Sequence, residues 1–215
     1  LIKKYKVIGI DNFNDYYDVK LKKARIKELK KNKSKKNFIF YKLDLTNLNS
    51  LKKLFKKHKI TKIIHLAAQA GVRHSLKKPE DYVDNNIIAT FNLLELSKKY
   101  KIKHLVFAST SSVYGNQIKM PFMESTSASH PIQFYAATKR SCELMCHSYS
   151  HLYKIPITVL RFFTVYGPWG RPDMAIYIFT EKILSNKSVK IFNNGNHSRD
   201  FTYISDIVSG IVKLL

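Results

Sequence analysis

Short apolar runs alternate with amphipathic segments along this chain. Five runs have the length and the β-branched or aromatic composition of buried strands, at residues 5–10, 37–43, 62–68, 104–109 and 157–162. Apolar side chains at helical spacing predict helices over residues 20–30, 51–58 and 80–99 and from residue 134 onward. This alternation predicts a parallel sheet with helices on both faces. With right-handed crossovers, the fold class is a doubly wound, Rossmann-like α/β sheet.

One expected part of such a fold is missing. A dinucleotide-binding sheet carries a glycine-rich phosphate loop after its first strand. The seven glycines, at positions 9, 71, 115, 167, 170, 195 and 210, cannot form a Gly-x-x-Gly-x-x-Gly motif. Asp11, however, follows an apolar run, where an acidic residue binds the adenosine ribose. We therefore expect the first strand and its glycine loop to precede Leu1. The alternative is a different α/β fold in which Asp11 is a coincidence.

The composition narrows the class of protein. The 215 residues are 45% hydrophobic, enough for one core and the start of a second lobe. No apolar run approaches the roughly 18 residues of a membrane span, and no secretory signal is visible. The net charge of +23 comes largely from lysines in 20–36 and 52–59, which alternate with apolar residues at helical spacing. Such runs are typical of solvated helix faces, and no nucleic-acid motif accompanies them. We expect no membrane or nucleic-acid partner.

Cys142 and Cys146 are the two cysteines of the chain. A disulfide between positions i and i+4 of a helix has poor geometry. Two thiols without a fixed histidine partner make no zinc site. We therefore expect buried, reduced packing residues, no metal site and a cytoplasmic location.

Candidate chemistry begins where the strand at 104–109 ends. Three hydroxyl residues follow it: Thr110, Ser111 and Ser112. The helix that starts at residue 134 carries Tyr135 and Lys139 four positions apart, hence on one face. A phenol has a pKa of about 10, and a nearby ammonium lowers it. With Thr110 bound to the same substrate oxygen, this set suits removal of a proton from an alcohol whose carbon gives up hydride.

Spacing alone does not establish this interpretation. Random placement of 13 tyrosines and 32 lysines produces about two Tyr-x-x-x-Lys pairs. The chain has two, because Tyr16 and Lys20 also match. An ordinary pair on a helix surface is therefore the alternative. The hydroxyls at the strand end, the Val-Tyr-Gly turn and the small residues at 136 and 137 favour the catalytic interpretation.

Several motifs carry a family resemblance. SSVYG followed by YAATK resembles the extended branch of the short-chain dehydrogenase/reductase superfamily, and RFFTVYGPWGRPDMA and RDFTYI resemble its UDP-glucuronate 4-epimerases. HLAAQAGVRHS and GIDNFNDYYD are similar to the same family. The resemblance implies an N-terminally truncated NAD-binding domain at 1–164 and the start of a nucleotide-sugar-binding region at 165–215. Within the latter, 203–215 is expected to be a helix that returns to the sheet domain.

The resemblance also implies NAD as cofactor. Asp11 takes the ribose hydroxyls, and its charge disfavours the 2′-phosphate of NADP. For Asp44 a helix N-cap region is the alternative, and for Ala67 and Ala68 it is plain strand packing. The implied cofactor-binding residues are Asp11, Asn12, Asn14, Asp44, Leu45, Leu66, Ala67, Ala68, Asn85, Tyr135, Lys139 and Phe162.

The implied reaction interconverts UDP-glucuronate and UDP-galacturonate. Tyr135 takes the C4 hydroxyl proton, hydride leaves C4, and the 4-keto sugar rotates before the hydride returns to its other face. Lys139 keeps Tyr135 ionised, and Thr110 binds O4. For Arg199, a surface salt bridge with Asp200 or a neighbouring residue is the alternative. The implied substrate-binding residues are Thr110, Ser111, Ser112, Thr164, Arg171, Val189, Ile191, Phe192 and Arg199, with 189–192 expected as a strand against uracil.

Other functions remain open at this point. The related 4,6-dehydratases place Asp-Glu after the catalytic threonine, whereas Ser111 and Ser112 follow Thr110 here. UDP-glucose 4-epimerase is the main enzymatic alternative. A nucleotide-sensing or partner-binding domain is the non-catalytic alternative, although a sensor needs no base such as Tyr135. The resemblance also suggests a homodimer formed through helices of the sheet domain, and we expect residues 1–215 alone to be inactive without the glycine loop.

Overall fold

The structure of this chain is a computed structural model that describes residues 1–31, 35–117, 119–196 and 198–215. The chain folds as two compact units. The first unit contains Leu1–Lys42 and Phe163–Lys213, and the second contains Leu43–Phe162 with Leu214–Leu215. The functional division expected at residue 164 remains a prediction.

The second unit is built on a three-stranded parallel sheet. Its strands are β3 (Lys62–His65), β4 (His104–Thr110) and β5 (Ile157–Phe162), in the order β3-β4-β5. The central strand has three consecutive fully buried residues, Leu105, Val106 and Phe107. A continuous apolar run of this kind is what a parallel strand needs when both of its faces are covered.

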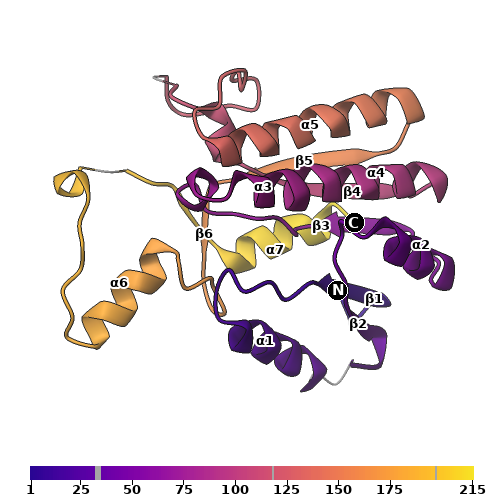
Figure 1. Ribbon diagram of the computed structural model, residues 1–215, viewed down its shortest axis with the longest axis horizontal. Helices are drawn as coiled ribbons and strands as arrows, with labels where there is room; N and C mark the ends of the chain where they lie inside the picture. Colours follow the sequence, from indigo (N-terminus) through magenta and orange to yellow (C-terminus); the bar gives the residue numbers. More distant parts are fainter. Residues whose placement is uncertain (32–34, 118, 197) are drawn as a thin grey trace. The chain divides into compact units, whose positions relative to one another are not determined.

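Two helices cover one face of this sheet. Figure 1 shows α4 (Ala89–Lys99) and α5 (Phe134–Tyr153) side by side along β4 and β5. Leu94 of α4, Leu105 and Phe107 of β4, and Cys142 and Cys146 of α5 form the core cluster between them. Both cysteines are free and buried, as expected. Burial raises the pKa of Cys146 to about 12, so this thiol packs as an apolar group.

The helix expected over 80–99 is present but irregular. It consists of α3 (Pro79–Tyr82), the π-helix η3 (Val83–Ile88) and α4. Within η3, the buried Asn86 amide accepts a hydrogen bond from Gln69 N–H (2.8 Å) and donates to Gln69 O (3.1 Å) and Thr138 Oγ1 (3.0 Å). These bonds stabilise a widened turn, a feature frequent at functional sites. This unit also contains the 3-10 helix η2 (His74–Leu76) and the helix α2 (Leu48–Lys57). The helix α2 is capped by Asn47, whose Oδ1 accepts from Ser50 N–H.

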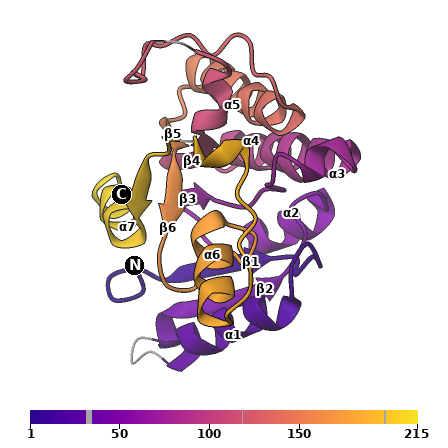
Figure 2. The same cartoon turned by 90° about the vertical axis from the view of Figure 1, so that its left-hand side faces the viewer.

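The first unit contains two small parallel sheets. One pairs β1 (Val7–Asp11) with β2 (Phe38–Lys42), and the other pairs β6 (Thr164–Tyr166) with β7 (Phe201–Tyr203). The five predicted strands therefore exist and are parallel, but they pair in two groups, β1–β2 and β3-β4-β5. Figure 2 shows α1 next to β1 and β2. The helices of this unit are α1 (Val19–Lys31), the 3-10 helices η1 (Lys35–Asn37) and η5 (Asn193–Gly195), α6 (Ala175–Leu184) and α7 (Ile204–Lys213).

Some expected elements are wrong. The strand expected over 62–68 ends at His65, so Leu66, Ala67 and Ala68 lie outside it. The strand expected over 189–192 is absent: within the described residues this segment pairs with no other strand, and Ile191 and Phe192 are 65% and 45% exposed. An apolar run needs a neighbouring strand for its backbone hydrogen bonds. Among the described helices, none is both long and apolar enough to cross a membrane.

Candidate active site

Tyr135 and Lys139 lie in the first two turns of α5, which begins at Phe134. Their spacing puts both side chains on one face of that helix. The competing pair has no such arrangement, because α1 begins at Val19 and Tyr16 therefore precedes it. The Tyr16 hydroxyl instead donates to Asp173 Oδ2 (3.1 Å). Of the two Tyr-x-x-x-Lys pairs, Tyr135 and Lys139 are thus the pair whose residues both belong to one helix.

Lys139 is a buried cation. Its residue is 3% exposed, and its Nζ lies 4.1 Å from the centroid of the Phe107 ring. Burial lowers the pKa of Lys139 to about 8, although Cys142, Cys146 and Glu143 act in the opposite direction. Below pH 8 the ammonium is therefore still the main form. A protonated lysine in this position can lower the pKa of a neighbouring phenol.

His65, at the end of β3, does not compete for this role. Burial and, to a smaller extent, the charge of Lys139 lower its pKa to about 3. The neutral imidazole has Nε2 3.1 Å from Thr90 Oγ1, and its ring centroid lies 5.5 Å from that of Phe107. Of these two groups, Lys139 is consequently the one that carries a positive charge.

The ring of Tyr135 is supported by Tyr82, a residue that the sequence pattern did not single out. The two rings meet edge to face, with centroids 6.0 Å apart and planes at 74°. Tyr82 is fully buried, and its hydroxyl donates to the carbonyls of Ala70 (3.0 Å) and Gly71 (2.5 Å). Tyr82 thus connects the segment after β3 to the ring of Tyr135. A buried tyrosine in α3 has no spacing that marks it in the sequence.

Thr110 forms the turn that leaves β4. It lies opposite Phe162 of β5 and precedes the 3-10 helix η4 (Ser111–Tyr114). Its Oγ1 accepts from Ser112 N–H and donates to Ser112 Oγ, both at 3.2 Å. The turn packs against α5, so the second unit brings the three hydroxyl residues and the Tyr–Lys pair together. Their shared contact with one substrate oxygen stays a prediction.

Gly115 ends this turn with φ +65°. A Cβ added there would come within 2.3 Å of the carbonyl oxygen of His130. That separation is too short for any side chain, and the backbone conformation is one that L-residues seldom adopt. Glycine is therefore required for the chain to leave the turn and pass His130.

An ion pair that spacing arguments also missed lies one turn beyond Lys139. Glu143 of α5 accepts from Arg161 of β5, with Oε1 3.1 Å from Nε and Oε2 2.9 Å from Nη2. The side chain of Glu143 is buried. The sequence shows that Glu143 lies four residues after Lys139, but it does not show that Arg161 of β5 is its partner.

Of the other cofactor residues expected in this unit, Leu66–Ala68 and Phe162 lie at the carboxyl edge of the sheet. Because the carboxyl ends of parallel strands meet at one edge, Leu66–Ala68, Thr110 and Phe162 are neighbours there. Asn85 Nδ2 donates to Asp81 O (2.8 Å). Asp44 Oδ1, next to Leu45, accepts from Thr46 N–H (2.8 Å) and Thr46 Oγ1 (2.7 Å). The N-cap residue of α2 is Asn47, and Asp44 forms the turn that leads into this helix, so its role in the N-cap region stays an alternative.

Asp11, Asn12 and Asn14 belong to the first unit. Asp11 ends β1, and its Oδ1 accepts from Phe13 N–H (2.7 Å) in a turn where Phe13 has φ 56°. Asn12 Oδ1 accepts from Asn14 N–H (3.0 Å). Lys22 Nζ donates to the backbone oxygen (2.8 Å) and Oδ1 (2.6 Å) of Asn14. The loop is thus fixed locally, with a carboxylate at the strand end.

The remaining expected substrate residues also lie in the first unit: Thr164, Arg171, Val189, Ile191, Phe192 and Arg199. Arg171 forms a two-point ion pair with Asp173, with distances of 2.9 and 2.6 Å. Arg199 Nη1 donates to Ser198 O (2.7 Å), and the described part of the chain has no salt bridge between Arg199 and Asp200. Their assignment to the sugar nucleotide stays a prediction.

Parallel strands, helices that cover them and a helical Tyr–Lys pair beside a hydroxyl-bearing strand end define a Rossmann-like α/β protein. The chain belongs to the NAD dependent epimerase/dehydratase family, whose model matches residues 1–215.

Known relatives agree with this assignment. The chain is 51% identical over 216 residues to the UDP-glucuronate 4-epimerase of Thermodesulfobacterium geofontis, covering 100% of this chain and 66% of that protein. A solved structure of UDP-glucuronic acid 4-epimerase from Bacillus cereus, in complex with UDP-glucuronic acid and NAD, matches with a TM-score of 0.89, 41% identity and coverage of 98% and 65%. UDP-glucose 4-epimerase from Thermotoga maritima matches with a TM-score of 0.85, 33% identity and coverage of 96% and 64%. The chain thus spans just under two thirds of the length of these relatives.

Proposed function

We propose that the complete gene product is an NAD-dependent 4-epimerase that interconverts UDP-glucuronate and UDP-galacturonate. The observation that carries this proposal is the buried Lys139, one turn after Tyr135 and protonated below about pH 8. The relatives support the substrate, because identity is higher to the UDP-glucuronic acid enzyme (41%) than to the UDP-glucose enzyme (33%).

The residues present fit NAD. The carboxylate of Asp11 ends β1 and is oriented by Phe13 N–H, which suits two ribose hydroxyls and repels a 2′-phosphate. The segment 66–68 leaves the sheet edge next to β4, where small residues let a ribose approach the backbone. When bound, NAD supplies the acceptor and donor of hydride. Asn85, Lys139 and Phe162 are the groups that we expect at its nicotinamide side.

The chain's own groups handle the proton. Tyr135 takes the proton of the sugar C4 hydroxyl, and Lys139 stabilises the resulting phenolate by its charge. Thr110, fixed by its bonds with Ser112, donates a hydrogen bond to O4. Ser111, Ser112 and Thr164 bind the C5 carboxylate through hydroxyl groups. Hydroxyl donors bind more loosely than a two-point arginine pair, which suits a 4-keto sugar that must turn over within the site.

The test is a conversion assay on the complete gene product. With UDP-glucuronate and NAD we expect UDP-galacturonate, separated and quantified by chromatography of the nucleotide sugars. NADP in place of NAD should support much less conversion because of Asp11. A kcat/KM for UDP-glucose equal to or above that for UDP-glucuronate would contradict the assigned substrate and favour the UDP-glucose enzyme.

We propose that the protein acts in the cytoplasm, without a membrane or nucleic-acid partner. The two thiols support this location, because both are free and buried and form no disulfide with each other. The lysine-rich helices α1 and α2 support the absence of a nucleic-acid role, because their charges follow amphipathic helices rather than a recognition motif.

A homodimer formed through the outer faces of α4 and α5 is also proposed. Leu144 and Leu152 are two turns apart on α5 and are 54% and 63% exposed, and Phe91 of α4 is exposed as well. Adjacent exposed apolar side chains on neighbouring helices favour association with a second copy. We expect Leu152→Arg to convert a dimer to a monomer in sedimentation experiments. Ile183→Arg, which changes an equally exposed residue of α6, serves as the control, and a dimeric Leu152→Arg variant would refute this interface.

A further inference from the structure

A fully bonded carboxylate lies beneath the candidate site. Glu143 is 4% exposed, and each of its oxygens accepts two hydrogen bonds. Oε1 accepts from Ser109 Oγ (2.5 Å) and Arg161 Nε (3.1 Å). Oε2 accepts from Arg161 Nη2 (2.9 Å) and Arg140 Nη1 (2.8 Å). Burial raises the pKa of Glu143, but these hydrogen bonds outweigh it and hold the pKa below its usual range, so the carboxylate is ionised.

This cluster contacts the start and the end of the turn that carries Thr110. Ser109 directly precedes Thr110 and lies opposite Arg161 on the paired strand β5. The guanidinium of Arg161 lies over the ring of Tyr114, 4.8 Å from its centroid. Tyr114 is the last residue of η4. One carboxylate on α5 therefore connects, directly or through Arg161, to both ends of the turn.

The same carboxylate is a close charge for Lys139. Groups that act on Lys139 include His65 of β3, the ring of Phe107 of β4, and Cys142, Cys146 and Glu143 on α5. His65 is neutral, and burial raises the pKa of both thiols. Among these groups Glu143 is the one that carries a full negative charge at neutral pH.

Stability alone does not account for such a cluster. Replacing a buried ion pair with apolar residues of similar volume is often neutral or stabilising. Here the charged groups join β4, β5 and α5 at the points that set the placement of Thr110 and Lys139. Apolar residues in these positions could stabilise the fold, but they would not hold Thr110 and Lys139 in place through directed hydrogen bonds.

We propose that Glu143 and Arg161 are positioning residues that fix the Thr110–Ser112 turn against α5 and place a negative charge next to Lys139. The catalytic consequence of this arrangement rests on the proposed epimerase function. The arrangement itself does not, and it can be measured without turnover.

Two variants of the complete gene product separate the placement of the Thr110–Ser112 turn from the effect of the negative charge next to Lys139. Ser109→Ala removes the bond at the start of the turn and keeps the carboxylate. Glu143→Gln removes the charge and leaves two guanidiniums without it. In hydrogen–deuterium exchange with NAD present, we expect faster exchange of residues 109–115 in both variants, by about tenfold in Glu143→Gln.

Kinetics with UDP-glucuronate provide the second measurement. We expect kcat to fall about tenfold or more in Glu143→Gln and less in Ser109→Ala, with KM changed by no more than about twofold, because positioning acts on the reacting geometry. In Glu143→Gln the high-pH limb of kcat should move to lower pH, since Lys139 loses its proton more readily without the carboxylate. Ser109→Ala should leave that limb in place. If Glu143 had a purely structural role, Glu143→Gln would not shift the high-pH limb of kcat, and it would not lower kcat while KM stays constant.

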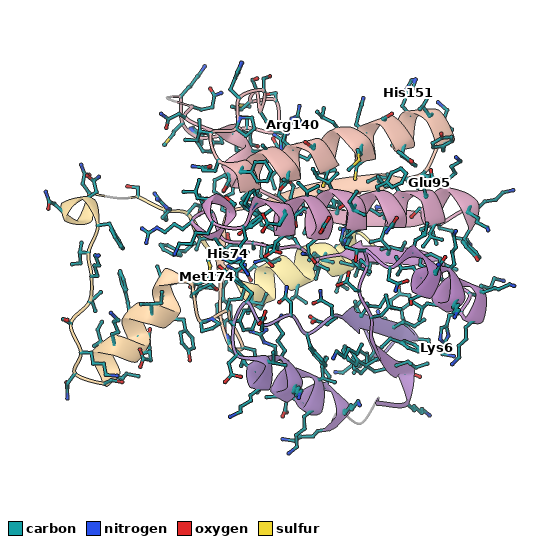
Figure 3. All side chains as sticks on the ribbon, viewed as in Figure 1. Lys6, His74, Glu95, Arg140, His151 and Met174 are labelled. Atoms are coloured by element: carbon teal, nitrogen blue, oxygen red, sulfur yellow. The ribbon has the colours of Figure 1, made fainter. Side chains whose placement is uncertain are left out.

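Glu95→Gln is the matched control. Glu95 accepts from the Tyr149 hydroxyl (2.6 Å) and thereby joins α4 to α5. Figure 3 shows it on α4, towards the end of α5 that carries His151 rather than the end that carries Arg140. We expect wild-type exchange at 109–115 and wild-type kcat in this variant. Unchanged exchange at 109–115 in Glu143→Gln, or a kcat within twofold of wild type, would overturn the positioning role. Failure of the wild-type protein to convert UDP-glucuronate would count against the proposed function, while the exchange comparison would still decide the role of Glu143.

Discussion

Tyr135→Phe is expected to lower kcat for UDP-glucuronate epimerisation by about 10³-fold, the contribution of a positioned general base. The phenyl ring keeps its edge-to-face contact with Tyr82, so the loss is confined to the hydroxyl. Formation of UDP-galacturonate measures the loss. Titration calorimetry with UDP should give an unchanged Kd, because the hydroxyl acts at the sugar C4 rather than at the nucleotide.

Tyr149→Phe controls for the loss of a tyrosine hydroxyl from the same helix. Tyr149 donates to Glu95, across from α4 and away from the Thr110 turn. We expect this variant to keep a kcat close to that of wild type. A wild-type rate in Tyr135→Phe would remove Tyr135 as the base and, with it, the proposed mechanism.

Lys139→Met is expected to separate catalysis from stability. Its kcat should fall by about 10²-fold or more, because the phenolate of Tyr135 loses its neighbouring cation. Its free energy of unfolding at pH 7 should rise. Burial holds the pKa of Lys139 at about 8, whereas in the unfolded chain this pKa has the ordinary lysine value of 10.5. A difference of that size corresponds to about 3 kcal/mol of destabilisation while both states are protonated.

The pH dependence of this difference has a definite sign. Between pH 8 and 10.5 the unfolded chain binds more protons at this lysine than the folded chain, so wild-type stability rises with pH. The stability advantage of Lys139→Met should therefore be largest below pH 8 and vanish above about pH 10.5. Denaturant unfolding at a series of pH values measures it. A variant that is less stable than wild type at pH 7 would show that the protein compensates the buried charge fully.

Patterns of neighbouring residues in the sequence predicted the strand and the helix that carry the candidate site. The apolar run at 104–109 predicted β4, and the four-residue spacing of Tyr135 and Lys139 placed them on one helix face. The supporting groups were not predictable, because their partners are remote in the chain. Asn86 bonds to Gln69, 17 positions away, and to Thr138, 52 away. Ser109 and Glu143 are 34 positions apart. No periodicity encodes such pairs.

Two strands expected from the sequence differ from those in the structure. Three apolar residues at 189–192, Val189, Ile191 and Phe192, predict a strand, but a strand forms only where a neighbouring backbone accepts its hydrogen bonds. β3 is also shorter than expected: it ends at His65, opposite Phe107, although Leu66–Ala68 continue the apolar run and β4 extends to Thr110. The helix α6 escaped prediction because its apolar side chains do not follow one face: none of its residues is buried.

The widened turn at Val83–Ile88 sets the rotational phase of α4, the helix that follows it directly. Each residue of a regular helix advances the side chains by about 100°. Removing one residue from this stretch would restore ordinary hydrogen bonding, yet it would rotate Leu94 of α4 out of the core cluster that it forms with β4 and α5. The π-helical stretch therefore sets the direction in which the side chains of α4 point. Because of it, Leu94 reaches the interior of the second unit.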